Sequence, residues 1–218
     1  MITIKNVSKA FEDKVLFSNL NLNIEDGEFV IFSGPSGCGK TTLLNMVGAI
    51  EKIDSGEIQV DGIDISKRKN QLQYFRKKVG FLFQNFALVD NKTVRENLRL
   101  VRKDSKTNIT MEKALESVGL IDKIDKKVYT LSGGEQQRVA LARLMLKKSD
   151  VILADEPTGS LDKNNAKIVL NILKELNEQG KTIILVTHDE EVKKQGSRVI
   201  NLVKNNGSFI ESFVDRTH

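Results

Sequence analysis

One stretch of this sequence limits the available folds more than any other: a glycine-rich turn that follows an apolar run. Residues 28–32 are typical of a buried strand, and residues 34–41 have the spacing G-x-x-x-x-G-K-[ST]. The residues that follow predict a helix that starts near Gly39, continues through Val47 and ends at Gly48. A strand, a glycine-rich turn and a helix in this order predict a loop that binds phosphate.

The residue types in this loop suit a nucleotide. Glycines let backbone N–H groups approach phosphates closely, and the positive end of the following helix adds to the attraction. We expect Lys40 to reach the β- and γ-phosphates of ATP and the hydroxyl of Thr41 to hold Mg²⁺. The predicted nucleotide-binding residues of this segment are Gly34, Pro35, Ser36, Gly37, Cys38, Gly39, Lys40, Thr41 and Thr42.

Two acidic residues, Asp155 and Glu156, end a second apolar run that begins at Val151. Both emerge at the carboxyl end of the predicted strand, where α/β proteins place their ligands. We expect Asp155 to orient Mg²⁺, directly or through water, and Glu156 to polarise the attacking water as general base. The alternative is an ordinary solvated strand end, but two acids after four apolar residues, followed by Pro-Thr-Gly, favour the catalytic interpretation.

A second short glycine motif, Ser132-Gly133-Gly134, precedes a predicted amphipathic helix. A helix N-terminus, a hydroxyl and two glycines are suited to a second anion. One nucleotide cannot occupy both anion sites in a small domain without crowding, so we expect this motif to serve ATP bound to another copy of the chain. Taken alone, the motif fits a simple helix cap equally well.

Composition excludes several classes of protein. The chain has 218 residues, and its apolar runs stay far below the about 18 residues that a membrane span needs. The net charge of +5 comes from scattered lysines without a groove-binding motif, so no nucleic-acid partner is expected. The first residues alternate like a strand and lack the regions of a signal peptide, and a single Cys excludes an internal disulfide. These observations predict a cytoplasmic protein without a Cys/His metal site.

The order of the predicted elements favours one domain over residues 1–218. Residues 2–33, 56–62 and 79–83 read as strands, and the segment of about 85–128 reads as an inserted helical lobe between the core parts 1–84 and 129–218. In the lobe, residues 93–100 and 110–118 are helical and residues 103–108 form a polar loop.

The second half of the core alternates between helices and strands. Helices at 135–147 and 163–179 alternate with strands at 151–155 and 182–187, a pattern that predicts an α/β fold with a mainly parallel, doubly wound sheet. Residues 198–203 and 208–213 are predicted to form a terminal hairpin around Asn205-Asn206-Gly207.

With these motifs in this order, the chain resembles the nucleotide-binding subunit of ATP-binding cassette (ABC) transporters over essentially its whole length. Residues 131–135, Leu-Ser-Gly-Gly-Glu, look like the family's signature motif, which usually ends in Gln where this chain has Glu135. The resemblance implies an ABC-type P-loop fold with an N-terminal antiparallel β subdomain. It also implies ATPase activity and a homodimer that closes, in the ATP-bound state, on two nucleotides between the phosphate loop of one copy and the signature of the other.

The resemblance assigns roles to four further residues. Gln84 matches the glutamine that senses the γ-phosphate, contributes to the metal site and contacts the membrane partner, and His188 matches the switch histidine. Asp162, with Ser160 before it, matches the loop that links the two sites, although Gly159-Ser160 departs slightly from the commonest pattern. Phe11 is in the place of the aromatic that stacks on adenine; a residue of the sheet core is the alternative.

The same motifs look most like the macrolide-exporter and lipoprotein-releasing branch. That resemblance implies a separate integral-membrane permease, docked in part by residues 84–97, and attachment to the inner face of the cell membrane through it. It implies export or extraction of a peptide, bacteriocin, antibiotic or lipoprotein, with a bacteriocin or antimicrobial peptide as the specific expectation. The length leaves room for one cassette and no large C-terminal regulatory domain.

Three alternatives share these motifs. The first is a solute-importer ATPase, and the second is an ATP-gated mechanical or signalling switch without a transported substrate. The third, an ABC protein acting on DNA or ribosomes, is disfavoured because the chain has neither a long coiled coil nor a second cassette.

Overall fold

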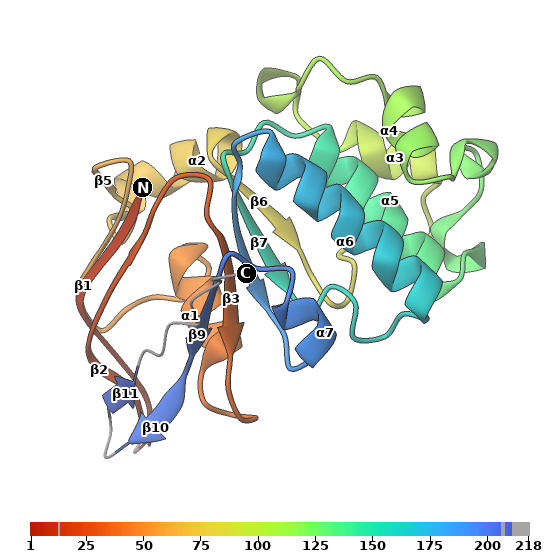
Figure 1. The fold of residues 1–218 in the computed structure, drawn as a ribbon. Helices are drawn as coiled ribbons and strands as arrows, with labels where there is room; N and C mark the ends of the chain where they lie inside the picture. Colours follow the sequence, from red (N-terminus) through yellow and green to blue (C-terminus); the bar gives the residue numbers. More distant parts are fainter. Residues whose placement is uncertain (13, 206–207, 211–218) are drawn as a thin grey trace.

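The computed structural model describes residues 1–12, 14–205 and 208–210, and these contain two main β-sheets (Figure 1). The first is antiparallel, with the strand order β2 (Lys14–Ile24), β1 (Ile2–Phe11), β4 (Ser55–Val60) and β5 (Ile63–Asp64). The second is parallel, with the order β6 (Val79–Leu82), β7 (Val151–Asp155), β8 (Thr182–Val186), β3 (Phe29–Ser33) and β9 (Arg198–Asn201). A small hairpin joins β10 (Val203–Asn205) to β11 (Ser208–Ile210).

The parallel sheet forms the centre of the molecule because its strands are apolar on both faces. Every residue of β3 and β8 is buried, and β7 is buried up to Asp155. Continuous apolar strands of this kind need cover on both sides. Helix α1 (Lys40–Val47) covers one face and lies between the two sheets, where its Leu43 and Val47 pack with apolar residues of both.

Helices cover the other face. The remaining helices are α2 (Arg68–Lys77), α3 (Val94–Arg99), α4 (Met111–Ser117), α5 (Gly133–Met145), α6 (Lys163–Glu178) and α7 (Glu190–Lys193), with 3₁₀ turns at Lys103–Ser105, Ile121–Lys123 and Val128–Thr130. Of these, α3 to α7 contribute buried side chains on this face, whereas Tyr74 of α2 packs with α1 and the antiparallel sheet. In Figure 1, α5 and α6 lie side by side against the sheet, and α3 and α4 lie beyond them. Apolar side chains of α3 to α6 and of the sheet form one continuous core cluster. The segment proposed as a lobe therefore packs on α5 and has no separate core.

The predicted fold class is confirmed: a parallel α/β core with an antiparallel N-terminal sheet. The predicted terminal hairpin is wrong in its first arm. Residues 198–201 form β9, which pairs in parallel with β3, because Val199 and Ile200 are buried at the edge of the core sheet. The observed hairpin begins at Val203, and residues 211–213 of the prediction lie outside the described residues.

Two further local features were not expected. The sequence did not predict helix α2. Tyr74 is its only buried residue, so the segment carries no apolar stripe that would indicate a helix. The predicted polar loop 103–108 contains the 3₁₀ turn Lys103–Ser105. None of the helices in the described ranges is long and apolar enough to cross a membrane.

Candidate nucleotide site

The phosphate loop connects β3 to α1 and folds tightly over its own lysine. Gly34 has φ +135°, and a Cβ there would lie 2.3 Å from the carbonyl oxygen of Leu202, so only glycine fits. The ammonium of Lys40 donates hydrogen bonds of 2.9 Å to the carbonyl oxygens of Gly34 and of Pro35. The positive charge is thus held at the mouth of the loop, at the N-terminus of α1, where a phosphate would meet it.

Two oxygen-bearing side chains meet beside this loop. The hydroxyl of Thr41, in the first turn of α1, donates a 3.0 Å hydrogen bond to Oδ1 of Asp155 at the end of β7. Burial raises the pKa of the Asp155 carboxyl, the hydrogen bond from Thr41 opposes that rise, and the charge of Glu156 adds to it. A hydroxyl and a half-buried carboxylate are hard oxygen donors of the kind that Mg²⁺ prefers, so the residues present fit this ion.

The next residue, Glu156, pairs with a histidine. Its Oε1 lies 2.8 Å from Nδ1 of His188, and the direction of this hydrogen bond depends on the tautomer of the ring. Glu156 has φ +44°, a left-handed conformation that is costly for a side chain with a Cβ, and its N–H donates to the carbonyl of Val186 at 3.0 Å. Such strain persists only where the surroundings hold the backbone in place.

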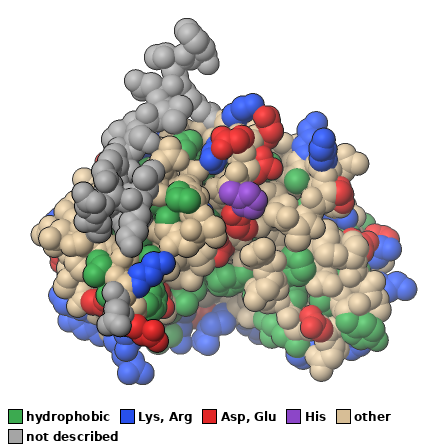
Figure 2. Space-filling model, turned by 90° about the horizontal axis from the view of Figure 1, so that it is seen from below, with side chains coloured by type: hydrophobic (Ala, Val, Ile, Leu, Met, Phe, Trp, Pro, Cys, Tyr) green, Lys and Arg blue, Asp and Glu red, His purple; other side chains and the backbone are tan. Residues whose placement is uncertain are grey.

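These side chains gather at one edge of the parallel sheet. In Figure 1 the arrow of β3 points toward the face that Figure 2 shows, and there a histidine lies among acidic side chains. The His188 side chain is 76% exposed, whereas that of Glu156 is 17% exposed. An incoming ligand can therefore reach the histidine directly, while the carboxylate is screened from solvent.

The signature segment begins α5 with a complete capping box. The Ser132 hydroxyl accepts from the N–H of Glu135, and a carboxylate oxygen of Glu135 accepts from the N–H of Ser132 at 2.8 Å. Gly134 lies against α6, since a Cβ at this position would approach Asn165 to 2.7 Å. Asp162 caps α6 by accepting from the N–H groups of Asn164 and Asn165, each at 3.0 Å. The starts of α5 and α6 thus lie in close contact at Gly134 and Asn165.

Comparison with known proteins agrees with this geometry. Residues 17–159 match the ABC transporter family. The chain belongs to this family.

Several members are closely similar to this cassette. The uncharacterized ABC transporter ATP-binding protein MJ1508 of Methanocaldococcus jannaschii is 43% identical, over 97% of this chain and 98% of its own length. The macrolide export ATP-binding/permease protein MacB of Campylobacter jejuni is 41% identical over 93% of this chain, which spans only 33% of MacB. The glutamine transport ATP-binding protein GlnQ of Bacillus subtilis is 38% identical, over 98% of this chain and 90% of its own length.

A similar solved structure contains the products of ATP hydrolysis. The dimeric post-hydrolysis state of the cassette MJ0796, from Methanocaldococcus jannaschii and bound to ADP and Pi, has a TM-score of 0.82 and 36% identity to this chain and covers 96% of both chains. The chain is therefore an ABC ATPase, an enzyme that binds and hydrolyses ATP. The resemblance stated from the sequence is confirmed at the level of the family, and MacB agrees with the branch.

The structure places the predicted site residues of the cassette in two groups. Lys40, Thr41, Asp155, Glu156 and His188 meet at the sheet edge. Residues 132–135 and Asp162 lie at the starts of α5 and α6, and within the described part of the chain no hydrogen bond joins residues 132–135 to the phosphate loop.

Gln84 and Phe11 lie outside both hydrogen-bonded groups of the cassette. Gln84 is exposed in the turn after β6. Phe11 is 46% exposed, and the ammonium of Lys9 lies 4.5 Å from the centre of its ring. That ammonium also pairs with Glu51 at 2.7 Å, and the pKa of Lys9 is raised, chiefly by this hydrogen bond. One face of the ring is thus covered by a cation, so Phe11 is not a residue of the sheet core; its role toward adenine stays a prediction.

Sequence reasoning missed two polar residues of α5. Gln137 is buried and donates a 2.8 Å hydrogen bond to the carbonyl of Pro157, directly after Glu156. Arg143 donates to the carbonyls of Phe86 and Ala87, in the turn that contains Gln84. Both interrupt the apolar stripe of the helix, and a polar residue in such a stripe is the signal that could have revealed them.

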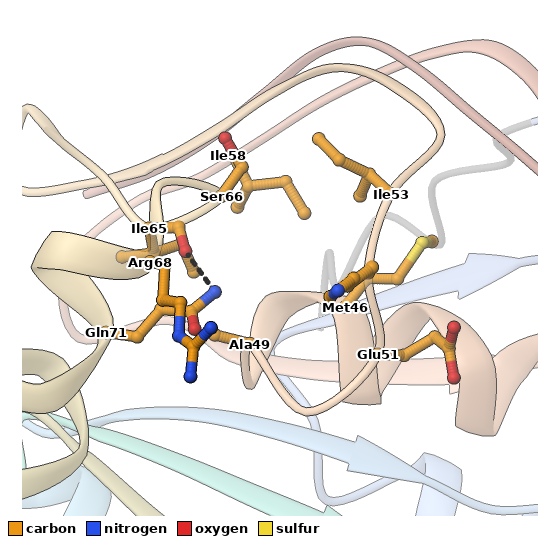
Figure 3. A pocket seen from close by; sticks show the side chains of 10 residues that line it. Met46, Ala49, Glu51, Ile53, Ile58, Ile65, Ser66, Arg68 and Gln71 are labelled. Atoms are coloured by element: carbon orange, nitrogen blue, oxygen red, sulfur yellow. Dashed lines mark hydrogen bonds between the residues drawn. The ribbon is translucent and has the colours of Figure 1, made fainter.

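A cavity of about 550 Å³ lies apart from this site (Figure 3). It opens between the C-terminal end of α1, strand β4 and helix α2, and Met46, Ile58 and Ile65 contribute apolar side chains to its lining. None of the predicted nucleotide-site residues lines it. This cavity is therefore separate from the candidate nucleotide site.

Proposed function

We propose that this ATPase closes as a head-to-tail homodimer on two ATP molecules and that hydrolysis drives a separate membrane permease that exports a peptide or antibiotic. The observation that carries the proposal is the pair of hydrogen bonds at the sheet edge, Thr41 to Asp155 and Glu156 to His188. They bring a hydroxyl and a carboxylate suited to a metal ion, and a second carboxylate suited to act as a base, together next to the phosphate loop. The name of MacB supports export, and the dimeric MJ0796 structure supports the closed dimer.

Each residue at the edge has a distinct role in this proposal. Lys40 transfers its hydrogen bonds from the carbonyls of Gly34 and Pro35 to the β- and γ-phosphates. Thr41 and Asp155, with Gln84 from the neighbouring turn, hold Mg²⁺, which when bound neutralises charge on the phosphates. Glu156 accepts the proton of the attacking water, and His188 holds that carboxylate in position and contacts the γ-phosphate.

The second ATP contact comes from the start of α5. Within the described residues, the N–H groups of Gly133 and Gly134 donate no hydrogen bond to another residue. Unpaired donors at a helix N-terminus bind anions well. A two-fold dimer presents these donors of one copy to the γ-phosphate on the other, and each subunit then supplies both halves of a site. Hydrolysis removes the bridging phosphate, and the dimer reopens.

Besides residues 84–97, we assign to the permease a groove between α2, the end of α3 and α5, which none of residues 84–97 lines. This α2–α5 groove has a volume of about 440 Å³ and exposes apolar side chains, with Leu72 58% and Leu100 51% exposed. Arg143 and Lys147 also line it, and among the described residues neither pairs with a carboxylate. A partner segment with an apolar anchor flanked by acidic side chains fits this chemistry. Docking there would attach the cassette to the inner face of the cell membrane.

The mass of the Glu156→Gln protein in solution tests the dimer. Light scattering without nucleotide, with ATP in the absence of Mg²⁺, and with Mg-ATP should show a shift from monomer to dimer that depends on ATP, because binding remains while hydrolysis stops. A monomer in every condition, with bound nucleotide demonstrated and the co-purified permease present, would exclude the head-to-tail closure. Normal hydrolysis by Glu156→Gln would exclude the assignment of the general base.

Import is the second candidate, because GlnQ, named for glutamine transport, is 38% identical over 98% of this chain. The cassette motifs do not set direction, since the substrate path lies in the permease. Transport assays with the cassette and its permease in proteoliposomes, with ATP on the cassette side only, distinguish the two: loss of substrate from that side indicates export, and accumulation there indicates import.

A further inference from the structure

The turn that carries Gln84 has a strained backbone. Phe86 and Ala87 both adopt left-handed conformations, with φ of 62° and 48°. Side chains with a Cβ disfavour this region, and two consecutive residues in it are uncommon. Such a conformation persists only where surrounding contacts hold it. The contacts that hold this turn therefore decide where Gln84 is placed.

One side chain supplies the main contact. Arg143 donates from Nη1 to the carbonyl of Ala87 at 2.6 Å and from Nη2 to the carbonyl of Phe86 at 3.2 Å. The planar fork of a guanidinium suits two neighbouring acceptors in a way that a lysine ammonium does not. Burial lowers the pKa of Arg143, and in the described residues no acidic side chain compensates for that burial.

Arg143 belongs to the same helix as the signature. Ser132 caps α5, and Arg143 lies in its last turn. At the other end of the helix, the ring of Phe86 comes within 3.7 Å of where a Cβ on Gly133 would be. The turn thus contacts α5 near both ends: its carbonyls through Arg143 and its aromatic ring beside Gly133. Arg143 also lines the α2–α5 groove.

We propose that Arg143 is a positioning residue that clamps the Gln84 turn onto α5, so that Gln84 and the signature keep a set relative placement. A partner segment bound in the α2–α5 groove would contact Arg143. Through Arg143 it would act on both the Gln84 turn and the signature at the start of α5. This inference deepens the proposed function and rests on it for the groove's occupant. The clamp itself is a property of the single chain and can be tested without a partner.

Hydrogen exchange of the intact ATPase tests the clamp directly. In the native chain the amides of Phe86 and Ala87 donate to carbonyls within the turn. In Arg143→Lys, both amides should exchange with solvent at least about 5-fold faster than in the native protein. The amide of Val89, held by the side chain of Asn97 at 2.8 Å, should not change. Lys147→Gln is the matched control: it removes a cation from the same groove but not a bond to the turn. Unchanged exchange in Arg143→Lys, or equal acceleration in the control, would overturn the proposal.

Steady-state kinetics separate positioning from a general loss of structure. Arg143→Lys should lower kcat about 10-fold and leave KM for ATP within about 2-fold, because Gln84 is misplaced while the phosphate loop is intact. Adding Ala87→Gly, which removes the cost of the left-handed conformation, should restore kcat to within about 3-fold of the native value. A double variant as slow as Arg143→Lys alone would overturn the strain argument.

The two proposals fail in different ways. Faster exchange in Arg143→Lys together with a Glu156→Gln protein that stays monomeric with its permease would leave the clamp standing and remove the head-to-tail dimer. The reverse result would remove the clamp alone.

Discussion

The nucleotide edge and the α2–α5 groove differ in how their charges are paired. At the edge, Lys40 is bonded to two loop carbonyls, Thr41 to Asp155 and Glu156 to His188. In the groove, Arg143 and Lys147 are bonded to backbone carbonyls without an acidic partner among the described residues, and Leu72 and Leu100 are exposed. The edge thus combines a cation with two carboxylates, whereas the groove is lined by cations and apolar side chains and, in the described part of the chain, by no acidic residue.

This difference indicates which kind of ligand each region can bind. Paired groups at the edge exchange existing hydrogen bonds for those of a small charged ligand, which costs little reorganisation. Exposed apolar side chains beside half-buried cations gain only when a surface covers them. We therefore read the edge as a site for a nucleotide and the groove as a site for a protein.

The largest expected effect is at Lys40. Lys40→Met should reduce ATP hydrolysis by at least about 100-fold, because the transferred phosphate loses its preorganised cation, while the thermal midpoint changes little. Phosphate release under saturating Mg-ATP measures the loss. Hydrolysis within a few-fold of the native rate would show that the pairing of Lys40 with the loop is structural only, and the edge would then resemble the groove.

Two leucines at the end of α3 test whether the groove is a free surface or part of the core. Leu98 is fully buried, so Leu98→Ala should cost about 3 kcal/mol in the free energy of unfolding. Leu100 is 51% exposed, and Leu100→Ser should change that free energy by less than about 0.5 kcal/mol while weakening any partner complex. Urea unfolding compares the pair. Equal destabilisation would mean that Leu100 belongs to the core and that the groove is not a free surface.

The signature offers a matched pair of glycines. Gly134→Ala should destabilise the ATPase by about 1–3 kcal/mol, because the new methyl group would meet the Asn165 side chain at 2.7 Å. Gly133→Ala has room, with its nearest neighbour at 3.7 Å, and should be neutral in the same urea titration. If both variants were neutral, the starts of α5 and α6 would not be tightly packed, and the proposed second ATP contact would lack rigid support.

The smallest effect concerns the pH dependence of stability in the groove. Burial lowers the pKa of Lys147 to about 8, below its value in an unfolded chain. The penalty for burying its charge is fully present below about pH 8 and fades as pH rises, because the unfolded chain still binds the proton that the folded one has lost.

Lys147→Met removes that penalty. The variant should be more stable than the native protein at pH 7 by less than about 1 kcal/mol, since partial exposure screens the charge, and this advantage should shrink by pH 10. Urea midpoints at both pH values measure it. An advantage that grows with pH would show that Lys147 is already paired and that the groove needs no acidic partner.

Local sequence patterns predicted part of this structure. The strand, turn and helix around Lys40 and the acidic end of β7 were predictable because each depends on neighbouring residues. The parallel pairing of β9 was not, since Val199 and Ile200 fit a hairpin strand equally well. Helix α2 was missed because its surface is polar, and Arg143 because its acceptors lie 56 and 57 residues away.

By itself the sequence determined the chemical groups of the site, the order in which they occur and the family to which they belong. It could not determine which groups touch. Thr41 and Asp155 are 114 residues apart, and Glu156 and His188 are 32 apart. They meet because β7 and β8 pair in parallel with β3 alongside, so the carboxyl ends of the three strands open on one edge. Backbone pairing across the sheet is a nonlocal choice, and only the folded chain makes it.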